Sequence, residues 1–127
     1  MAHEILKLKS VHPTIGYSHA ARAGNTLYIA GQVAKDTDGN LVGNGDIQAQ
    51  VRQVYLNLKN ILGESGGNLQ SIVKMTTFLT HFNYIEAYRS VRSEYFQDPC
   101  PPNTLLIIDS LALPDYMIEV EAIAFLD

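Results

Sequence analysis

The first third of the chain has the residue pattern of three short strands. Residues 4–9 alternate apolar and polar side chains, as in a strand with one buried face. Residues 19–23 and 26–33 have the composition of two more strands, and the dipeptide Gly24-Asn25 separates them. Because this dipeptide suits the two-residue turn of a tight hairpin, we expect the second and third strands to pair.

A helical spacing begins after Asp46, which is a suitable N-cap residue. The Gly66-Gly67 pair is a suitable terminator, so the predicted helix has roughly four turns. Its apolar residues recur every three or four positions and form one face: Ile47, Val51, Val54, Tyr55, Leu58, Ile61 and Leu62.

The second half of the chain predicts a strand, a helix and two more strands. Residues 72–80 are rich in β-branched side chains, and Asn83 is expected to cap the second helix. Residues 104–108 and 117–125 have strand patterns. The inward residues of the second helix are Ile85, Tyr88, Val91, Tyr95 and Phe96. We therefore expect one α/β (α+β) domain over residues 1–127, in the order βββαβαββ.

Two helices cover only one face of such a sheet. The continuously apolar run at residues 104–108 sends side chains to both faces, so the second face also needs a cover. Self-association is the simplest cover, and the pattern therefore predicts an oligomer.

Composition narrows the classes of function. The chain has 127 residues, of which 46% are hydrophobic and 17% charged, as in ordinary soluble domains. No apolar run approaches the ~20 residues that a membrane span needs, so we expect a cytoplasmic protein. The net charge is −4 and the nine Lys and Arg residues are scattered. Nucleic acid is therefore not an expected partner.

The sequence contains only weak indications of a metal site or a reactive cysteine. Residues 36–40 resemble the start of a calcium loop, but Ile47 stands where the loop needs a bidentate Glu. Cys100, the only cysteine, lies among prolines and is interpreted as inert, with a nucleophile as the alternative. The four histidines lack zinc-ligand spacing: His3, His12, His19 and His81. We expect no metal site.

Two carboxylates stand out in the last predicted strand. Glu119 and Glu121 point in the same direction because side chains alternate along a strand. In one interpretation, one of the two is exposed and ion-paired and has no role in chemistry. The other gives one of them a buried environment and a raised pKa, which suits the handling of a proton or a water molecule. The pattern leaves both interpretations open.

Four motifs in this order resemble the YjgF/RidA (reactive intermediate deaminase) family. They are Ala30-Gly31-Gln32, the segment IVKMTTFLT at residues 72–80, PPNT at 101–104 and IEVEAIA at 118–124. The resemblance implies a chorismate-mutase-like fold, with two helices packed on a mixed sheet. It also implies a homotrimer with a central barrel, three clefts between subunits and no cofactor.

The same resemblance implies an activity. Deaminases of this family hydrolyse reactive enamines and imines, such as 2-aminoacrylate, to 2-keto acids and ammonia. By position, Glu119 is the acid that would orient or activate water, and Tyr17 and Gly31 would contact the substrate. Asn103 and Thr104 occupy the motif in which those enzymes place an Arg that clamps the substrate carboxylate. Asn is neutral and cannot supply the charge or the bidentate fork.

A positive charge on the second predicted helix could replace the missing Arg that clamps the carboxylate. Arg89 stands where the family's deaminases often have an Asn facing the cleft, so it would hold an anionic ligand from another direction. The alternative is an ordinary solvated helix residue.

Two functions follow from these residues. The first is hydrolysis of enamines or imines derived from a small anionic metabolite. The alternative is a non-catalytic metabolite-binding or regulatory protein, for which Asn103 is the main argument. A ribonuclease or translation inhibitor, a label that some members of the family carry, fits poorly with the net charge of −4.

Overall fold

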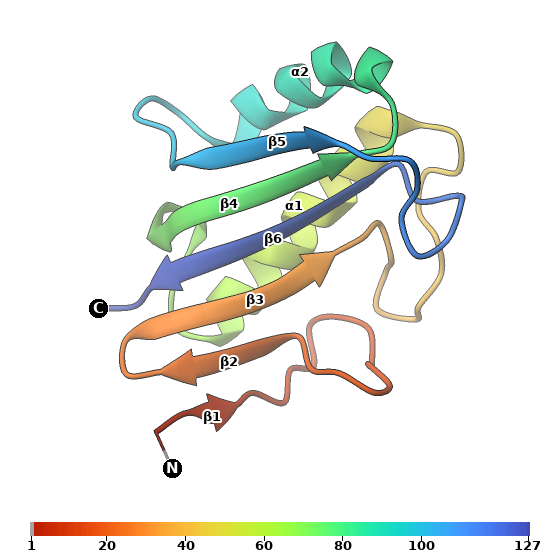
Figure 1. Ribbon diagram of the computed structural model, residues 1–127. Coiled ribbons are helices and arrows are strands. Elements are labelled where there is room, and N and C mark those ends of the chain that lie inside the picture. Colours follow the sequence, from red (N-terminus) through yellow and green to blue (C-terminus); the bar gives the residue numbers. More distant parts are fainter. Residues whose placement is uncertain (1) are drawn as a thin grey trace.

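The strands and helices follow the order that the residue pattern predicts. In the computed structural model, which describes residues 2–127, a six-stranded sheet carries two α-helices (Figure 1). The strands are β1 (Glu4–Ile5), β2 (Ala20–Ala23), β3 (Thr26–Gln32), β4 (Ile72–Leu79), β5 (Asn103–Ile107) and β6 (Ile118–Phe125). The α-helices are α1 (Ile47–Glu64) and α2 (Ile85–Tyr95), and short 3-10 helices span Leu69–Ser71 and Phe82–Tyr84.

The sheet is mixed, and its last strand in sequence lies near its centre. The order is β1-β2-β3-β6-β4-β5, so β6 lies between β3 and β4. Only β4 and β5 pair in parallel, while the other neighbours are antiparallel. The central place of β6 brings its side chains close to segments from both halves of the chain.

The predicted hairpin is confirmed. Strands β2 and β3 pair in antiparallel register, with Ala23 opposite Thr26. Gly24 has a φ of 60°, a conformation that glycine adopts without the steric cost that a Cβ brings. The two-residue turn is therefore the one that the sequence favours.

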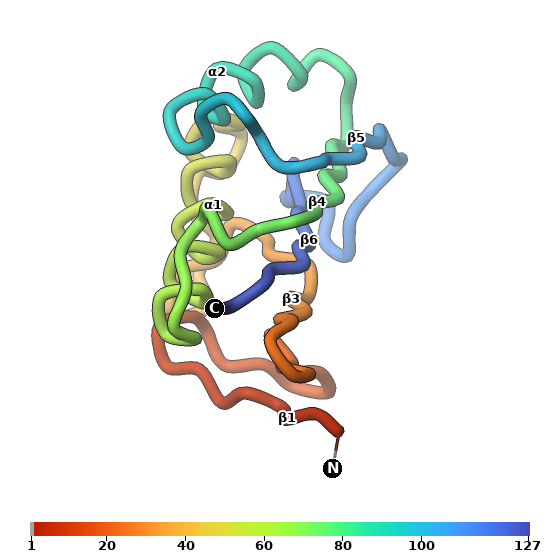
Figure 2. The backbone as a smooth tube through the Cα atoms, turned by 90° about the vertical axis from the view of Figure 1, so that its left-hand side faces the viewer, coloured from red at the N-terminus to blue at the C-terminus, as the bar shows by residue number. Residues whose placement is uncertain are grey.

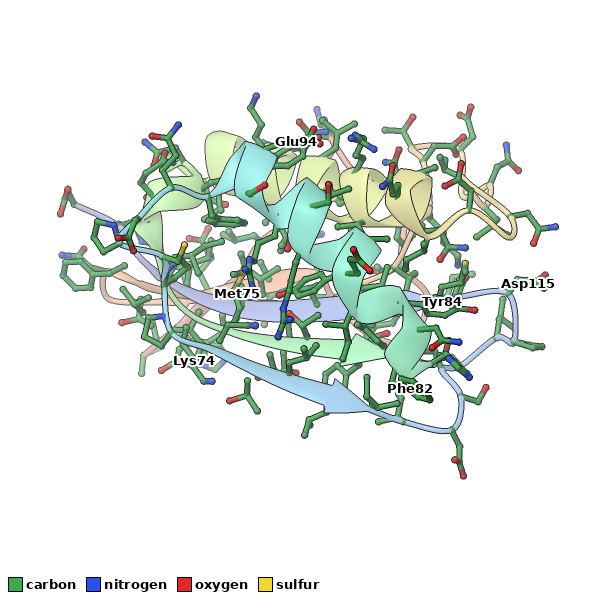
Figure 3. The ribbon with its side chains drawn as sticks, turned by 90° about the horizontal axis from the view of Figure 1, so that it is seen from above. Lys74, Met75, Phe82, Tyr84, Glu94 and Asp115 are labelled. Atoms are coloured by element: carbon green, nitrogen blue, oxygen red, sulfur yellow. The ribbon has the colours of Figure 1, made fainter. Side chains whose placement is uncertain are left out.

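Helix α1 is also as predicted, but longer. Asp46 is its N-cap and accepts a hydrogen bond from the backbone N–H of Ala49 at 3.1 Å. The helix continues for 18 residues to Glu64 because its terminating glycine, Gly66, comes two residues later with a φ of 92°. Its apolar face belongs to the core, with Val51, Leu58 and Leu62 fully buried and Ile47 partly buried. Figures 2 and 3 show both helices on the same side of the strands.

Two local expectations are wrong. Asn83 does not cap the second helix, because His81 caps the short 3-10 helix before it and accepts a hydrogen bond from the Asn83 N–H at 3.0 Å. Helix α2 then begins at Ile85 without a side-chain cap. The first strand covers only Glu4–Ile5, since the chain leaves the sheet edge after Leu6 donates to Ala20 O.

The sheet face opposite the helices, called here the uncovered face, presents large apolar side chains. Tyr28 is 50% exposed, Phe125 51% and Leu106 44%. Monomeric proteins seldom expose many such side chains together. Within residues 2–127, no helix combines the length and the apolar character that crossing a membrane would need.

Candidate functional site

A cleft at one end of the sheet brings together three of the predicted site residues. Tyr17 comes from the loop between β1 and β2, Gly31 from β3 and Glu119 from β6. The cleft has a volume of about 410 Å³. Its other lining residues are Ala30, Val33, Lys35, Ala112, Leu113 and Tyr116. These nine residues define what we call the Glu119 cleft.

A bulge in β3 shapes the floor of this cleft. Ile29 lies opposite Ala122 and Gln32 opposite Val120, so β3 uses one more residue than β6 over this interval. Such a bulge turns the backbone and often occurs beside active sites. A Cβ atom on Gly31 would lie only 2.5 Å from Oε2 of Glu119. Because glycine has no side chain, the space next to residue 31 is free for the Glu119 carboxylate.

The structure separates the environments of the two carboxylates. Both project from the uncovered face, as the alternation predicts, but Glu119 is half-buried and Glu121 is exposed. Burial raises the pKa of the Glu119 carboxyl, and the nearby charge of Glu121 raises it further. The only ion pair among residues 2–127 joins Arg52 and Glu94, so no cation is paired with Glu119.

A buried polar cluster lies beside Tyr17. The His19 ring makes an edge contact with Tyr17, with ring centroids 6.1 Å apart. Gln32 donates from Nε2 to His19 Nδ1 at 3.0 Å, so His19 Nε2 carries a proton and donates to the carbonyl of His12 at 2.8 Å. This cluster could not be predicted from the sequence, because no motif links its three residues.

Lys35 is a further residue of the site that the sequence did not predict. It follows β3 and lines the Glu119 cleft. Its ammonium lies over the ring of Tyr116, 5.9 Å from the ring centroid. A lone lysine after a strand has no distinguishing pattern, so only the folded chain places this charge.

The other predicted site residues lie elsewhere in the protomer. Asn103 begins the edge strand β5, which β4 separates from β6. Its side chain accepts a hydrogen bond from Thr77 Oγ1 at 2.8 Å and donates one to the Tyr88 hydroxyl at 3.1 Å. Thr104 accepts a hydrogen bond from Lys74 Nζ at 2.6 Å. Neither Asn103 nor Thr104 lines the Glu119 cleft.

Arg89 is exposed on α2 and also lies outside the Glu119 cleft. Its neighbour Tyr88 is the residue of α2 that turns inward and meets Asn103. The structure thus divides the six predicted residues into a group of three around Glu119 and a group of three at the β5 and α2 edge.

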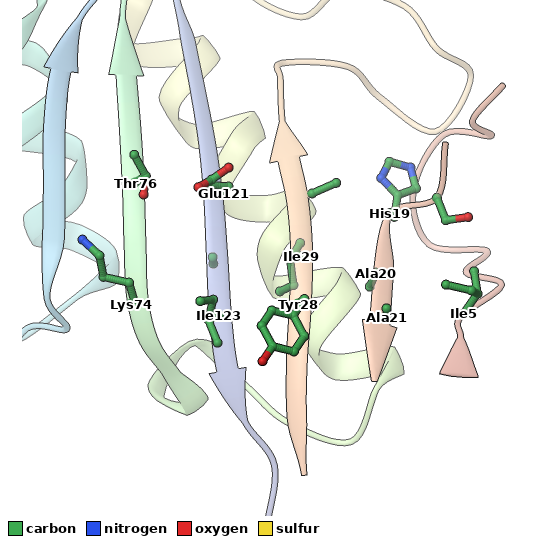
Figure 4. Close-up of a pocket in the computed structure, with 13 residues that line it drawn as sticks. Ile5, His19, Ala20, Ala21, Tyr28, Ile29, Lys74, Thr76, Glu121 and Ile123 are labelled. Carbon is green, nitrogen blue, oxygen red and sulfur yellow. The ribbon is translucent and has the colours of Figure 1, made fainter. Parts of the chain in front are cut away.

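A second hollow, of about 510 Å³, lies on the uncovered face. Figure 4 shows Tyr28, Lys74, Thr76 and Glu121 among its lining side chains, which come from neighbouring strands. Its walls are mainly apolar and its carboxylate, Glu121, is exposed. A surface of this kind suits protein contact better than chemistry on a small molecule.

Metal and thiol chemistry gain no support from the geometry. Within the part of the chain that the structure describes, no three His, Cys, Asp or Glu side chains are placed to hold a metal ion. Asp36 instead accepts the backbone N–H groups of Asp38 and Asn40, both at 3.0 Å, as a plain turn does. Cys100 is a free, exposed thiol.

Known proteins resemble this chain over nearly its whole length. A family model described as endoribonuclease L-PSP matches residues 7–126. A RutC family protein of Pyrococcus abyssi is 36% identical over 126 residues, which is 98% of each chain. A 2-iminobutanoate/2-iminopropanoate deaminase of Dermatophagoides farinae is 30% identical over 111 residues, 87% of this chain and 86% of the relative. The crystal structure of yeast Mmf1 matches with a TM-score of 0.92 and 32% identity, covering 98% of this chain and 99% of the yeast chain.

Proposed function

Because the chain belongs to the YjgF/RidA family, also called endoribonuclease L-PSP, we propose that it binds a small anionic metabolite and hydrolyses reactive enamines or imines. The products are 2-keto acids and ammonia. The observation that carries the proposal is the half-buried, unpaired Glu119 carboxylate beside Gly31 and Tyr17. The name of the Dermatophagoides farinae relative supports the reaction class.

In the proposed reaction Glu119 moves two protons in turn, both of which come from the attacking water molecule. Its carboxylate takes a proton from water while the water oxygen bonds to the imine carbon. Returning that proton to the nitrogen gives a neutral tetrahedral adduct with one hydroxyl and one amino group. Glu119 then takes the hydroxyl proton and passes it to the amino nitrogen, so that the C–N bond breaks and ammonia leaves as the carbonyl forms. A raised pKa supports this role, because a carboxyl group that titrates closer to neutral pH both accepts and returns a proton effectively.

We also propose that the protein is a homotrimer and that the ligand lies between two copies. In one protomer Arg89, Asn103 and Thr104 lie apart from Glu119, so a neighbouring copy is needed to bring them to the same ligand. Arg89 then holds the anionic end of the ligand. Calorimetry with small carboxylates checks this role: Arg89→Ala should abolish binding, and unchanged binding would exclude it.

A second candidate function is non-catalytic binding of a metabolite. Both polar atoms of the Asn103 amide are engaged, one by Thr77 and the other by Tyr88. This arrangement favours a structural role for the residue that stands in place of the family's carboxylate-clamping Arg. A cleft without that Arg would retain a ligand site and lose turnover.

The test is hydrolysis of 2-iminobutanoate, generated in situ, by the wild type and three variants. Glu119→Gln removes the proposed base, Glu121→Gln is its matched control on the same strand, and Asn103→Arg restores the family's cation. An active wild type that loses activity only with Glu119→Gln supports the enzyme. An inert wild type that gains activity with Asn103→Arg would favour the binding protein.

A further inference from the structure

Lys35 is the only positively charged residue among the nine that line the Glu119 cleft. It is half-buried, whereas Arg89 is exposed on α2. None of the sequence motifs predicts a cation in the cleft that contains Glu119. This charge can serve a ligand if the side chain is well positioned and has no partner of its own.

The backbone of Lys35 is held firmly by α1. Its carbonyl accepts hydrogen bonds from Asn57 Nδ2 at 3.1 Å and from Gln53 Nε2 at 3.2 Å. Its N–H donates to Val33 O at 2.8 Å, and Asn57 also donates to that carbonyl at 3.0 Å. Because Asn57 is buried, the segment that carries Lys35 is anchored to the core. A side chain that starts from an anchored backbone loses less entropy when it binds a ligand.

The charge of Lys35 is not neutralised within the protomer. The one ion pair in residues 2–127 joins Arg52 and Glu94. The adjacent carboxylate, Asp36, accepts two backbone N–H groups of its own turn. The Lys35 ammonium instead lies over the aromatic face of Tyr116, which attracts a cation weakly and leaves its N–H donors free.

From this geometry we propose that Lys35 binds the anionic group of the ligand, so that the Glu119 cleft selects small carboxylates. The reactive carbon then lies on the Glu119 side and the carboxylate on the Lys35 side of the same cleft. The inference rests on the proposed function in one respect, because it takes the Glu119 cleft as the ligand site. It goes further by adding a second anion contact, from the protomer that supplies Glu119, to the contact proposed for Arg89 of the neighbouring copy.

Calorimetry on the intact protein tests the assignment with two probes of the same shape, 2-oxobutanoate and the neutral 2-oxobutanamide. We expect Lys35→Met to weaken binding of 2-oxobutanoate about tenfold, because a charge-assisted contact is lost. Lys35→Arg should keep the affinity, since it keeps the charge. Lys59→Met, which removes an exposed lysine of α1, is the matched control and should have no effect.

Three results would overturn the proposal: no binding of 2-oxobutanoate to the wild type, unchanged binding to Lys35→Met, or an equal loss for the acid and the amide. An equal loss would mean that Lys35 acts through packing alone. If Lys35→Met does not fold, loss of affinity in Lys35→Arg with an intact melting transition would also contradict it.

Turnover separates this inference from the proposed function. Lys35-dependent binding without hydrolysis supports the inference and rejects the enzyme, whereas hydrolysis with an unchanged KM in Lys35→Met does the reverse.

Discussion

Gly31 and Glu119 share one small volume between β3 and β6. A Cβ atom on residue 31 would meet the Glu119 carboxylate at 2.5 Å, and the β3 bulge brings the two strands into this relation. The carboxylate therefore lies against bare backbone at the floor of the cleft. Its half-buried position removes part of its hydration, which is the main cause of its raised pKa.

The pH dependence of stability follows from this raised pKa. The folded state holds the Glu119 proton at pH values where the unfolded chain has released it, so the free energy of unfolding falls as pH rises from the usual glutamate pKa to the raised one. Glu119→Gln should remove this fall and be relatively more stable at neutral pH. Urea unfolding of both proteins between pH 4 and 8 measures the difference.

Glu121→Gln is the control for the cause of the shift. It removes the second cause, the neighbouring charge, but leaves the burial of Glu119 unchanged. A carboxyl-carbon NMR titration should therefore show a Glu119 pKa that is lower than in the wild type and still above that of an exposed glutamate. A Glu119 pKa at its ordinary value in the wild type would contradict both parts of the prediction.

Helix α1 positions the cleft as well as covering the sheet. Asn57 and Gln53 hold the backbone at Lys35. Gln50, which is fully buried, donates to the carbonyls of Gly43 and Asp115 at 3.1 and 2.9 Å and accepts from the Met117 N–H at 2.8 Å. One helix thus fastens the segment before it and the loop that carries Leu113 and Tyr116.

Gln50→Leu tests this role of α1. The substitution keeps the size of the side chain and leaves the Asp115 carbonyl and the Met117 N–H without partners, while the Gly43 carbonyl still accepts from the Asp46 N–H. We expect a loss of about 2 kcal/mol or more in the free energy of unfolding, at ~1–3 kcal/mol for each of the two unpaired groups. Hydrogen exchange at the Met117 amide should also become faster.

Gln48→Leu is the matched substitution, because Gln48 is exposed on the same helix. It should leave both the stability and the Met117 exchange rate close to those of the wild type. If the two variants lose the same stability, the Gln50 hydrogen bonds do not hold the loop.

At the scale of the whole molecule, the uncovered face carries large apolar side chains that nothing in the protomer buries. The helices bury the opposite face, while Tyr28, Leu106 and Phe125 remain about half exposed. The family to which the chain belongs and this apolar surface both support the proposed trimer. Closed symmetric assembly would bury the same surface on every copy.

Light scattering after gel filtration measures the assembly directly. The 14.0 kDa chain should give three times its own mass, and Leu106→Glu should reduce that mass by placing a charge in the buried contact. Leu56→Glu is the control, since Leu56 is 43% exposed on α1 against 44% for Leu106 on β5. A monomeric wild type, or equal effects of the two variants, would argue against assembly through this face.

Features that depend on neighbouring residues could be predicted from the sequence. The Asp46 cap of α1 joins residues three positions apart, and the hairpin at Gly24-Asn25 pairs two strands that follow each other directly in the sequence. The order of strands and helices follows from periodicity in the same way, and so does the shared direction of Glu119 and Glu121. The family resemblance, carried by four motifs, is confirmed by the match over residues 7–126.

Only the tertiary structure decided how the cleft is assembled. The contact of Gly31 with Glu119 and the anchoring of Lys35 by Asn57 join residues that are far apart in the chain. The engagement of Asn103 by Thr77 and Tyr88 is of the same kind. The sequence by itself determined the strands, the helices and their faces, because backbone geometry and side-chain periodicity are local. Which side chains meet depends on strand order and register, and these result from packing the whole core at once.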